Sequence, residues 1–318
     1  MAVHNWSFDP PSQTYRNHTF SNQLLFAAAG RTKMLPFTQV PANAFGRHMG
    51  ETLNLIRVNR LPTPQSANLT EGIRIPIDKL SLGSRTITVG ERGRGVEWTN
   101  LMEQLSIFSP SNFLQKELIR QMHYSVDAEV GEAFQSVEAR IIFIPTSATG
   151  GTFDTDGTPS TLANNEFTFA HCGVIADYLA GDIHCPPWSG ETYVGITTRK
   201  TLRGLKNDNL LQSVALYLQE GDFFYRGEVG MTENIRWIQV DVEETLSNTA
   251  GTSTVIGEGV VFGDEAVARV EVEAPHIRLQ ANFQNDFGRT QAAAWYGIYA
   301  FAPFYDIATD YRTVPLAA

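Results

Sequence analysis

The sequence predicts an α+β fold in which one long helix separates an extended ribbon from a mixed body. The ribbon is the segment Gly46–Trp98, which has no helical periodicity and is best described as one strand out and one strand back. The helix, residues 110–137, has apolar residues at a four-residue spacing along one face. Short helices and strands follow, and then two long strands. Helices and antiparallel strands segregated in this way are typical of an α+β arrangement.

The composition is that of a globular protein with one large or two ordinary domains. The chain has 318 residues, 42% of them hydrophobic, with 19 Phe, 10 Tyr and 5 Trp to fill a core. The net charge of -10 argues against binding nucleic acid through a strongly basic surface. It is compatible with a surface that faces DNA without binding it tightly. Two cysteines, Cys172 and Cys185, are too few for a disulfide scaffold and indicate reduced thiols. We find no signal segment at the start of the sequence and no apolar run near the ~20 residues of a membrane span.

The ribbon has too few apolar residues to bury a core of its own. Strand-like residues run from Leu53 to Val58 and return from Ile87 to Trp98, with a long polar turn region between them. A two-stranded ribbon alone is at best marginally stable in water. It therefore needs support from another part of this chain or from another copy of it.

Charge is distributed unevenly between the ribbon and a later part of the chain. Gly46–Trp98 holds eight Lys/Arg against five Asp/Glu, whereas Glu220–Ala274 holds twelve Asp/Glu against three Arg. Two solvated faces are one explanation. The other is an arm and a body that attract each other, within one subunit or between neighbours.

The long helix has the clearest signal in the sequence. Ser109 is suited to the N-cap and Pro110 to the first helical position. The apolar positions that recur every four residues are Leu114, Leu118, Met122, Val126, Val130 and Phe134. We expect these side chains to form core contacts rather than a cofactor site.

The remaining segments are expected as follows. Residues 1–45, broken by several prolines, form an extended arm with a short helical turn at Leu24–Ala29, and Asn100–Ser106 are a transition. The first half of the body is expected to have a strand at Arg140–Pro145, a loop at 146–165, a helix at Phe167–Ala180, a strand at Tyr193–Thr198, and short helices at Arg199–Leu205 and Leu210–Gln219. After a turn at Gly227–Gly230, strands are expected at Ile235–Val240, Gly259–Phe262 and Ala268–Glu273. Two longer strands, at His276–Phe283 and Ala292–Phe301, are expected around a turn at Asn285–Gly288.

Three short patterns were weighed as sites, and each favours a structural explanation. His171-Cys172 and His184-Cys185 contain zinc-ligand types, but adjacent ligands fit poorly and no Cys-x-x-Cys is present. Asp154–Gly157 resembles a calcium loop, but its glycine is misplaced and no Glu follows at the twelfth position. Gly90–Gly95 is glycine-rich without a strand-to-helix unit or a P-loop lysine. With no catalytic spacing elsewhere, we expect no catalytic, cofactor or metal site.

Several motifs in order resemble the major capsid proteins of tailed phages, specifically the family of the coliphage N-four head protein. They begin with Gly50-x-Thr52 and Arg57, Leu61-Pro62 and Leu69-Thr70-Glu71-Gly72. Tyr193–Thr197 with Arg199–Leu202 resembles a strand and helix of that family, although Thr198-Arg199 replaces its usual proline. Gly227–Gly230 with Ile235–Trp237, Val261–Ala266 and Ala294–Gly297 resemble later blocks, so that the similarity covers residues 46–310.

The resemblance implies the fold named after phage Hong Kong 97. Residues 1–45 would be the N-terminal arm and 46–98 the extended loop. Residues 99–165 and 268–303 would form the peripheral domain with its spine helix at 110–137, and 166–267 with 304–318 the axial domain. The function implied is that of a non-enzymatic capsid subunit that forms hexamers and pentamers of an icosahedral head around double-stranded DNA. The resemblance implies no role for a membrane. Scaffold, portal and decoration proteins would be potential partners, and assembly would take place in the host cytoplasm.

On this reading the ribbon of one subunit lies over the peripheral domain of the next. The residues we expect in contacts between subunits are the ribbon cations Arg57, Arg60, Arg74, Lys79, Arg85, Arg92 and Arg94 and the helix carboxylates Glu117, Asp127 and Glu132. No fused scaffold is expected, and a covalent cross-link through Lys79 is not favoured. The alternatives are a tail-tube or decoration protein, or an enzyme with an unrecognised site around His171 and His184.

Overall fold

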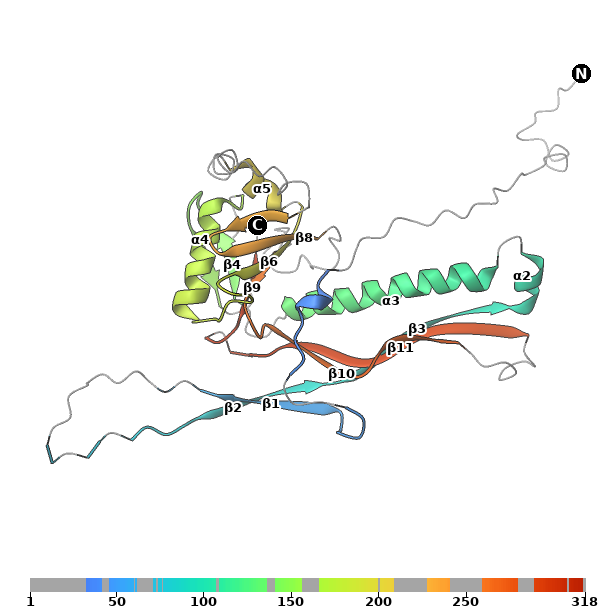
Figure 1. Ribbon diagram of the computed structural model, residues 1–318, viewed down its shortest axis with the longest axis horizontal. Coiled ribbons are helices and arrows are strands. Elements are labelled where there is room, and N and C mark those ends of the chain that lie inside the picture. Colours follow the sequence, from blue (N-terminus) through green and yellow to red (C-terminus); the bar gives the residue numbers. More distant parts are fainter. Residues whose placement is uncertain are drawn as a thin grey trace, which may run out of the picture.

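The computed structural model describes the greater part of the chain. The described residues are 33–41, 46–59, 61, 71–72, 74–75, 77–106, 109–135, 141–155, 166–199, 201–208, 228–240, 259–279, 289–307 and 309–316. Figure 1 shows a long helix lying along a three-stranded sheet, a larger sheet with its helices at one end, and a two-stranded ribbon on the other side of the three-stranded sheet.

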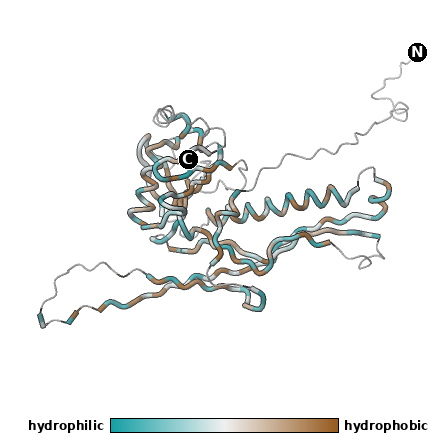
Figure 2. The backbone as a smooth tube through the Cα atoms, viewed as in Figure 1, coloured by the Kyte–Doolittle hydropathy of each residue, from teal (hydrophilic) through white to brown (hydrophobic). Residues whose placement is uncertain are grey.

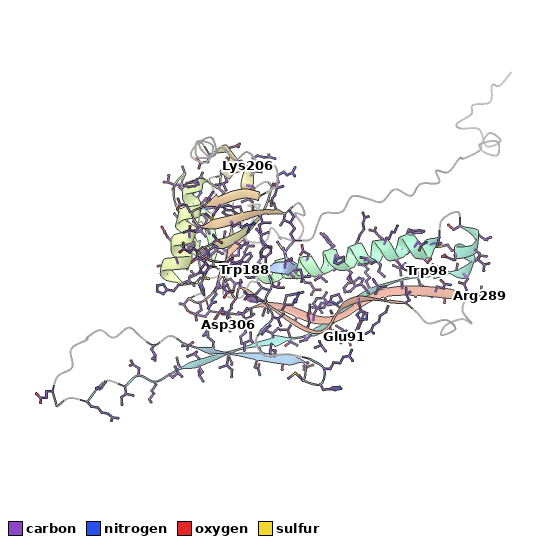
Figure 3. The ribbon with its side chains drawn as sticks, in the orientation of Figure 1. Glu91, Trp98, Trp188, Lys206, Arg289 and Asp306 are labelled. Atoms are coloured by element: carbon purple, nitrogen blue, oxygen red, sulfur yellow. The ribbon has the colours of Figure 1, made fainter. Side chains whose placement is uncertain are left out.

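The long helix is α3, Pro110–Phe134, and it begins at the proline expected from the sequence. It packs on the sheet of β10 (Val267–Leu279), β11 (Thr290–Pro303) and β3 (Gly90–Thr99), which is antiparallel with β11 in the centre. Leu118 and Met122 of α3 contact Trp98 of β3 and Trp295 of β11. The apolar stripe is therefore a core contact, as predicted, and Figure 3 shows Trp98 between helix and sheet.

Residues Gly90–Gly95, weighed above as a phosphate loop, lie in β3. Their glycines are explained by close strand packing, because a Cβ on Gly93 would come within 2.7 Å of the backbone oxygen of Trp295.

The larger sheet has seven strands in the order β5-β4-β12-β9-β6-β8-β7. Their bounds are β4 Ile142–Pro145, β5 Gly151–Asp154, β6 Tyr193–Thr198, β7 Glu228–Thr232, β8 Ile235–Val240, β9 Gly259–Phe262 and β12 Thr313–Leu316. The helices α4 (Phe169–Asp177) and α5 (Thr201–Asn207) and the π-helical turn η2 (Tyr178–Asp182) pack on one face. The end of α3 packs on the other, so β6 is buried along its whole length.

The ribbon consists of β1 (Thr52–Val58) and β2 (Leu82–Thr88), paired antiparallel with Leu53 opposite Ile87 and Val58 opposite Leu82. The expected outgoing strand is confirmed. The expected return strand is wrong in one respect, because it divides at Val89. Only β2 pairs with β1, whereas the next ten residues leave the ribbon as β3 and pair with β11.

Several boundaries differ from those expected. The turn expected at 227–230 lies instead at Glu233-Asn234, where both residues have positive φ, as a two-residue hairpin turn requires. β10 is one strand rather than two, since Pro275 is tolerated on this edge strand and the register merely shifts around it. The elements η1 (Leu35–Phe37), α2 (Asn100–Leu105), β5 and β12 were not predicted. The expected elements at 24–29, 210–219 and 285–288 lie outside the described residues.

Replacing Trp295 by alanine should destabilise the chain strongly. The side chain is 4% exposed and fills the junction between α3 and the sheet, so we expect Trp295→Ala to lower the free energy of unfolding by about 3–5 kcal/mol. Tyr296→Ala, on the opposite face of the same strand, is the matched control and should cost about 1 kcal/mol. Denaturant unfolding followed by circular dichroism measures both, and equal losses would contradict this packing.

Candidate functional site: the ribbon and the long helix

The base of the ribbon is held to the body by a small apolar cluster. Leu53 and Ile87, which face each other across the ribbon, pack on Ala268 and Val270 of β10. Alternate residues point the same way along a strand, so Leu55 and Arg57 also face the body. The ribbon therefore has one face directed to its own chain and one directed away from it.

Arg57 makes the contact furthest out along this inner face. Its Nη1 lies 3.5 Å from Asp306 Oδ1 and 3.5 Å from Asp310 Oδ2, and its Nε donates to Asn59 Oδ1 at 3.0 Å. The two carboxylates belong to the segment that connects β11 to β12. Arg57 is thus engaged within its own chain.

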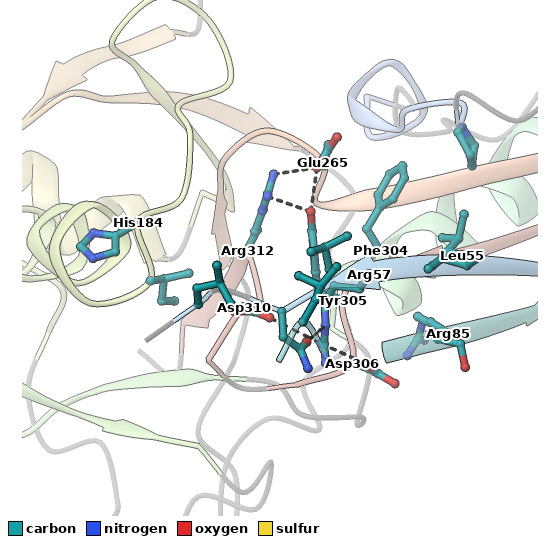
Figure 4. Close-up of a pocket in the computed structure, with 18 residues that line it drawn as sticks. Leu55, Arg57, Arg85, His184, Glu265, Phe304, Tyr305, Asp306, Asp310 and Arg312 are labelled. Carbon is teal, nitrogen blue, oxygen red and sulfur yellow. Dashed lines mark hydrogen bonds and ion pairs between the residues drawn. The ribbon is translucent and has the colours of Figure 1, made fainter. Parts of the chain in front are cut away.

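A cavity of about 900 Å³ lies between the ribbon and that connecting segment (Figure 4). In its wall, Arg312 donates to Glu265 at 2.9 Å and to the Tyr305 hydroxyl at 2.8 Å, and Tyr305 donates to Glu265 at 2.8 Å. Burial, and then the hydrogen bond to Glu265, raise the pKa of Tyr305 to about 12. These groups satisfy one another, and we assign the network a structural role.

The outer face of the ribbon is polar near its base and apolar toward its far end, and the described part of the chain leaves it uncovered. Ile56 is 74% exposed, and Val58 and Leu82, which pair across the strands, are also largely exposed. Exposed apolar residues continue beyond the paired strands at Leu80, Ile77 and Ile75. Figure 2 shows the hydrophobic colour along both ribbon strands. Contiguous exposed apolar residues of this kind indicate an interaction surface. We call this set the outer ribbon face.

A second apolar patch lies at the far end of the elongated body. Leu101 and Leu105 of α2 are 67% and 76% exposed, and Met102 is also exposed. In Figure 1, α2 is at one end of the molecule and the ribbon extends beyond the other. We call this patch the α2 tip.

One cation of the 46–98 segment pairs with a carboxylate of α3 inside the same chain. Arg92 Nε lies 3.0 Å from Glu129 Oε1. A cavity of about 340 Å³ beside this pair is lined by Arg85, Arg92, Glu129 and Glu132. Glu129 was not among the expected residues, and its position one turn before Glu132 on the same side of the helix was the available signal.

Asp127 also has an intrachain role. It is 1% exposed, and its oxygens accept hydrogen bonds from the backbone N–H groups of Lys33, Met34 and Leu35. In the described structure this carboxylate is therefore committed to its own chain, and a contact of Asp127 between subunits stays a prediction.

The other expected residues are distributed differently. Glu117 faces solvent and pairs with Arg120 at 3.4 Å. Arg74, Lys79, Arg94 and Glu132 are exposed, Arg85 is partly buried, and Arg60 lies outside the described residues. Arg92 and Arg94 lie on β3 and not in the two-stranded ribbon. For contacts between copies, these residues stay a prediction.

The histidines and cysteines weighed above have structural contacts. His171 Nδ1 accepts from the Thr168 N–H at 2.9 Å, and Nε2 lies 2.9 Å from the Ser147 carbonyl oxygen. Burial raises the pKa of Cys172 to about 12 and that of Cys185 to about 11, which disfavours the thiolate that binds metals. Among the described residues, no group of three or more His, Cys, Asp or Glu side chains is placed to hold a metal ion. Nor does any helix in that part of the chain have the length and apolarity to span a membrane.

The whole chain is similar to solved phage capsid and head structures. A chain of the cyanophage Pam1 capsid asymmetric unit matches with a TM-score of 0.71 and 15% identity, over 99% of each chain. The head of Helicobacter pylori bacteriophage KHP40 matches with a TM-score of 0.68 and 12% identity, over 99% of this chain and 98% of that one. The mature capsid of bacteriophage PhiM1 matches with a TM-score of 0.62 and 13% identity, over 99% and 96%. Neither a protein-family model nor a curated protein matches the sequence.

The chain has the fold of phage capsid proteins. The α+β class predicted from the sequence is confirmed, and so is the expected similarity to phage capsids.

The Arg92–Glu129 pair should give the stability of the chain a defined pH dependence. Burial raises the pKa of Glu129 above its ordinary value, and Arg92 opposes this rise. The Glu129 carboxyl therefore binds a proton more tightly in the folded chain than in the unfolded chain. The free-energy cost of burying the Glu129 carboxylate is relieved as the pH falls through this raised pKa. Arg92→Gln removes the partner of the charged form. We expect it to lower stability at neutral pH by about 0.5–1 kcal/mol, since Arg92 is 48% exposed.

The difference between Arg92→Gln and the wild-type chain should shrink toward zero as the pH falls below the raised pKa of Glu129, because the carboxyl is then protonated. Thermal unfolding at several pH values measures it, with Arg94→Gln as the control on the same strand. A difference that stays constant with pH would show that Arg92 acts through packing alone.

Proposed function

We propose that the protein is the major capsid protein of a tailed double-stranded DNA phage. Many copies form hexamers and pentamers of an icosahedral head that encloses the genome. The observation that carries this proposal is the end-to-end match to phage capsid chains, combined with a ribbon whose outer face is left uncovered by the described part of the chain. A structural role without catalysis agrees with the mutually satisfied charges of the larger cavity.

Assembly requires two unlike surfaces on each subunit, and the chain has two. Head-to-tail contacts join one surface to a different one, and they close into rings when the rotation between subunits closes. The outer ribbon face and the α2 tip lie at opposite ends of the molecule, so each is free to meet a neighbour. We propose that the outer ribbon face is buried against the next subunit.

The charged residues exposed around these surfaces orient the contact. Our candidates are Arg74 and Lys79 near the ribbon, Arg94 on β3, and Glu117 and Glu132 on α3. Arg57, Arg85 and Arg92 contribute mainly within their own chain, and Arg60 is a candidate on its sequence position alone. Complementary charges of this kind chiefly set specificity and association rate.

The remaining features of the proposal follow from the capsid role. A net charge of -10 fits a lining that encloses DNA without sequence-specific binding. Scaffold, portal and decoration proteins are potential partners, and assembly takes place in the host cytoplasm before the protein becomes part of the virion. The proposal includes an N-terminal arm at 1–45 and an extended loop at 46–98. It also includes a peripheral domain at 99–165 and 268–303 and an axial domain at 166–267 and 304–318.

Two alternatives are less well supported. A tail-tube or decoration protein would not be expected to match capsid chains over 99% of its length. An enzyme around His171 and His184 would need a reactive group, but both His171 ring nitrogens are already engaged. Negative-stain microscopy of the expressed protein tests the proposal directly. Shells, sheets or capsomer rings are expected, and a monomer at all concentrations would overturn it.

Polar substitutions on the outer ribbon face should block assembly without unfolding the chain. Ile56 and Leu82 are exposed, so Ile56→Asn with Leu82→Asn is expected to change the free energy of unfolding by less than about 1 kcal/mol. Losing their burial between subunits should abolish particles seen by microscopy and sedimentation. Thr86→Asn on the same outward face is the matched control and should assemble. Normal particles from the double variant would rule out this face as a contact.

Reversing ribbon charges tests the orienting role separately. Arg74→Glu with Lys79→Glu should slow or block assembly through like-charge repulsion, while the monomer keeps its unfolding temperature because both side chains are exposed. Light scattering measures the rate, which should recover partly at higher salt if repulsion is the cause. An unchanged rate would exclude both residues.

A further inference from the structure

The segment Lys33–Pro41 crosses the junction between the two sheets, and we call it the strap. At its start, the N–H groups of Met34 and Leu35 donate to Asp127 Oδ1 at 2.8 and 3.2 Å, and that of Lys33 donates to Asp127 Oδ2 at 3.3 Å. Met34 and Leu35 begin the 3₁₀ turn η1, and the next residue, Pro36, has no N–H. Asp127 thus caps this turn from another element, the helix α3.

The middle of the strap is attached to the larger sheet by apolar packing. Met34 is fully buried in the cluster that contains Val130 and Phe134 of α3 and Val260 and Phe262 of the sheet. Further along, the ring of Phe37 lies 5.8 Å from that of Phe262 and 5.9 Å from that of Trp188. The Lys33 ammonium also donates to the Gln239 carbonyl oxygen in β8.

The end of the strap is attached to the three-stranded sheet by Gln39. Its backbone N–H donates to the Val267 carbonyl oxygen at 2.9 Å, and its carbonyl oxygen accepts from the Arg269 N–H at 2.7 Å. Its side chain bonds Asp264 and accepts from the Glu265 N–H, at the point where the chain passes from β9 to β10. One short segment therefore contacts α3, the larger sheet and the three-stranded sheet.

We propose that the strap is a clasp that fixes the angle between the two sheets, and that Asp127 anchors its first end. The proposal concerns a single folded chain, and so does not depend on whether the protein assembles into a shell.

The Asp127 end is the polar anchor of the strap. A buried carboxylate is stable only while its hydrogen-bond donors stay in place, and both regain hydration when the contact opens. Burial raises the pKa of Asp127, and the three backbone hydrogen bonds oppose this rise. Met34 makes both kinds of contact, since its N–H donates to Asp127 and its side chain is fully buried, so the polar and apolar attachments at this end support each other.

Hydrogen exchange on Asp127→Ala tests the clasp. The amide protons of Met34 and Leu35, held by Asp127, should exchange at least about tenfold faster, whereas strands β6 and β8 should keep their protection. Asp127→Asn keeps one acceptor oxygen and should give a smaller increase, which provides a graded variant if Asp127→Ala folds poorly. Glu132→Ala, an exposed carboxylate on the same helix, is the matched control and should leave the strap unchanged.

The angle between the sheets is tested by spin labels on Lys116→Cys in α3 and Asn207→Cys in α5, both exposed. Labelled chains are diluted with unlabelled chains so that distances within one chain dominate in any assembly state. Asp127→Ala should broaden the distance distribution relative to Glu132→Ala. Unchanged exchange at Met34 and Leu35, or faster exchange with an unchanged distribution, would overturn the proposal. Failure of the protein to form particles would affect neither readout.

Discussion

The pairing of β3 with β11 is the constraint on which most of this structure depends. It joins residues 90–99 to residues 290–299, and so fixes two distant parts of the chain in one register. The face that it creates carries Trp98 and Trp295, and α3 lies on that face through Leu118 and Met122. Because β3 continues directly from β2, the same pairing sets where the ribbon leaves the body. Ribbon, helix and sheet therefore form one mechanical unit, and the ribbon needs only a small apolar cluster at its base.

The local sequence pattern was sufficient to predict an element and its bounds wherever buried residues recur with a simple period. The four-residue spacing of apolar residues predicted α3 to within three residues of its observed end, and runs of β-branched residues predicted β6, β8 and β9 with their bounds. β12 was missed because Thr313–Leu316 is four residues long and includes a proline, and only its pairing with β9 and β4 makes it a strand. The division of the return strand at Val89 was missed for the same reason, since nothing local identifies β11 as the partner of β3. The fold class was thus predictable, whereas the pairing of strands far apart in sequence was not.

The intrachain partners of the charged residues were not predictable from the sequence. The expectation that cations of the 46–98 segment attract carboxylates of the long helix describes the Arg92–Glu129 pair, but the pair lies within one chain. Arg57 faces Asp306 and Asp310, which are about 250 residues away in sequence, and no periodicity links them. Asp127 illustrates the limit best. On a helical wheel it is a solvent-facing carboxylate, yet the strap covers it and turns it into a backbone cap. A sequence pattern predicts which face of a helix is apolar, but it does not predict which other segment of the chain covers a residue on the opposite face.

The difference between satisfied charges and unsatisfied apolar surface bears on how copies of this chain would associate. Arg57, Arg92, Arg312 and Asp127 already have partners in their own chain, so breaking these contacts for a neighbour would bring little net gain. The outer ribbon face and the α2 tip have no such partners in the described structure, and burying apolar area is the larger source of association free energy. In the proposed shell, apolar contact would therefore supply the affinity, and exposed charges such as Arg74 and Lys79 the orientation. The ribbon is packed on the body at its base, and its outer face is exposed in the described structure. Its apolar residues are therefore held in position before a neighbouring subunit binds. Such preorganisation reduces the entropy lost on association, and the β3–β11 pairing is what provides it.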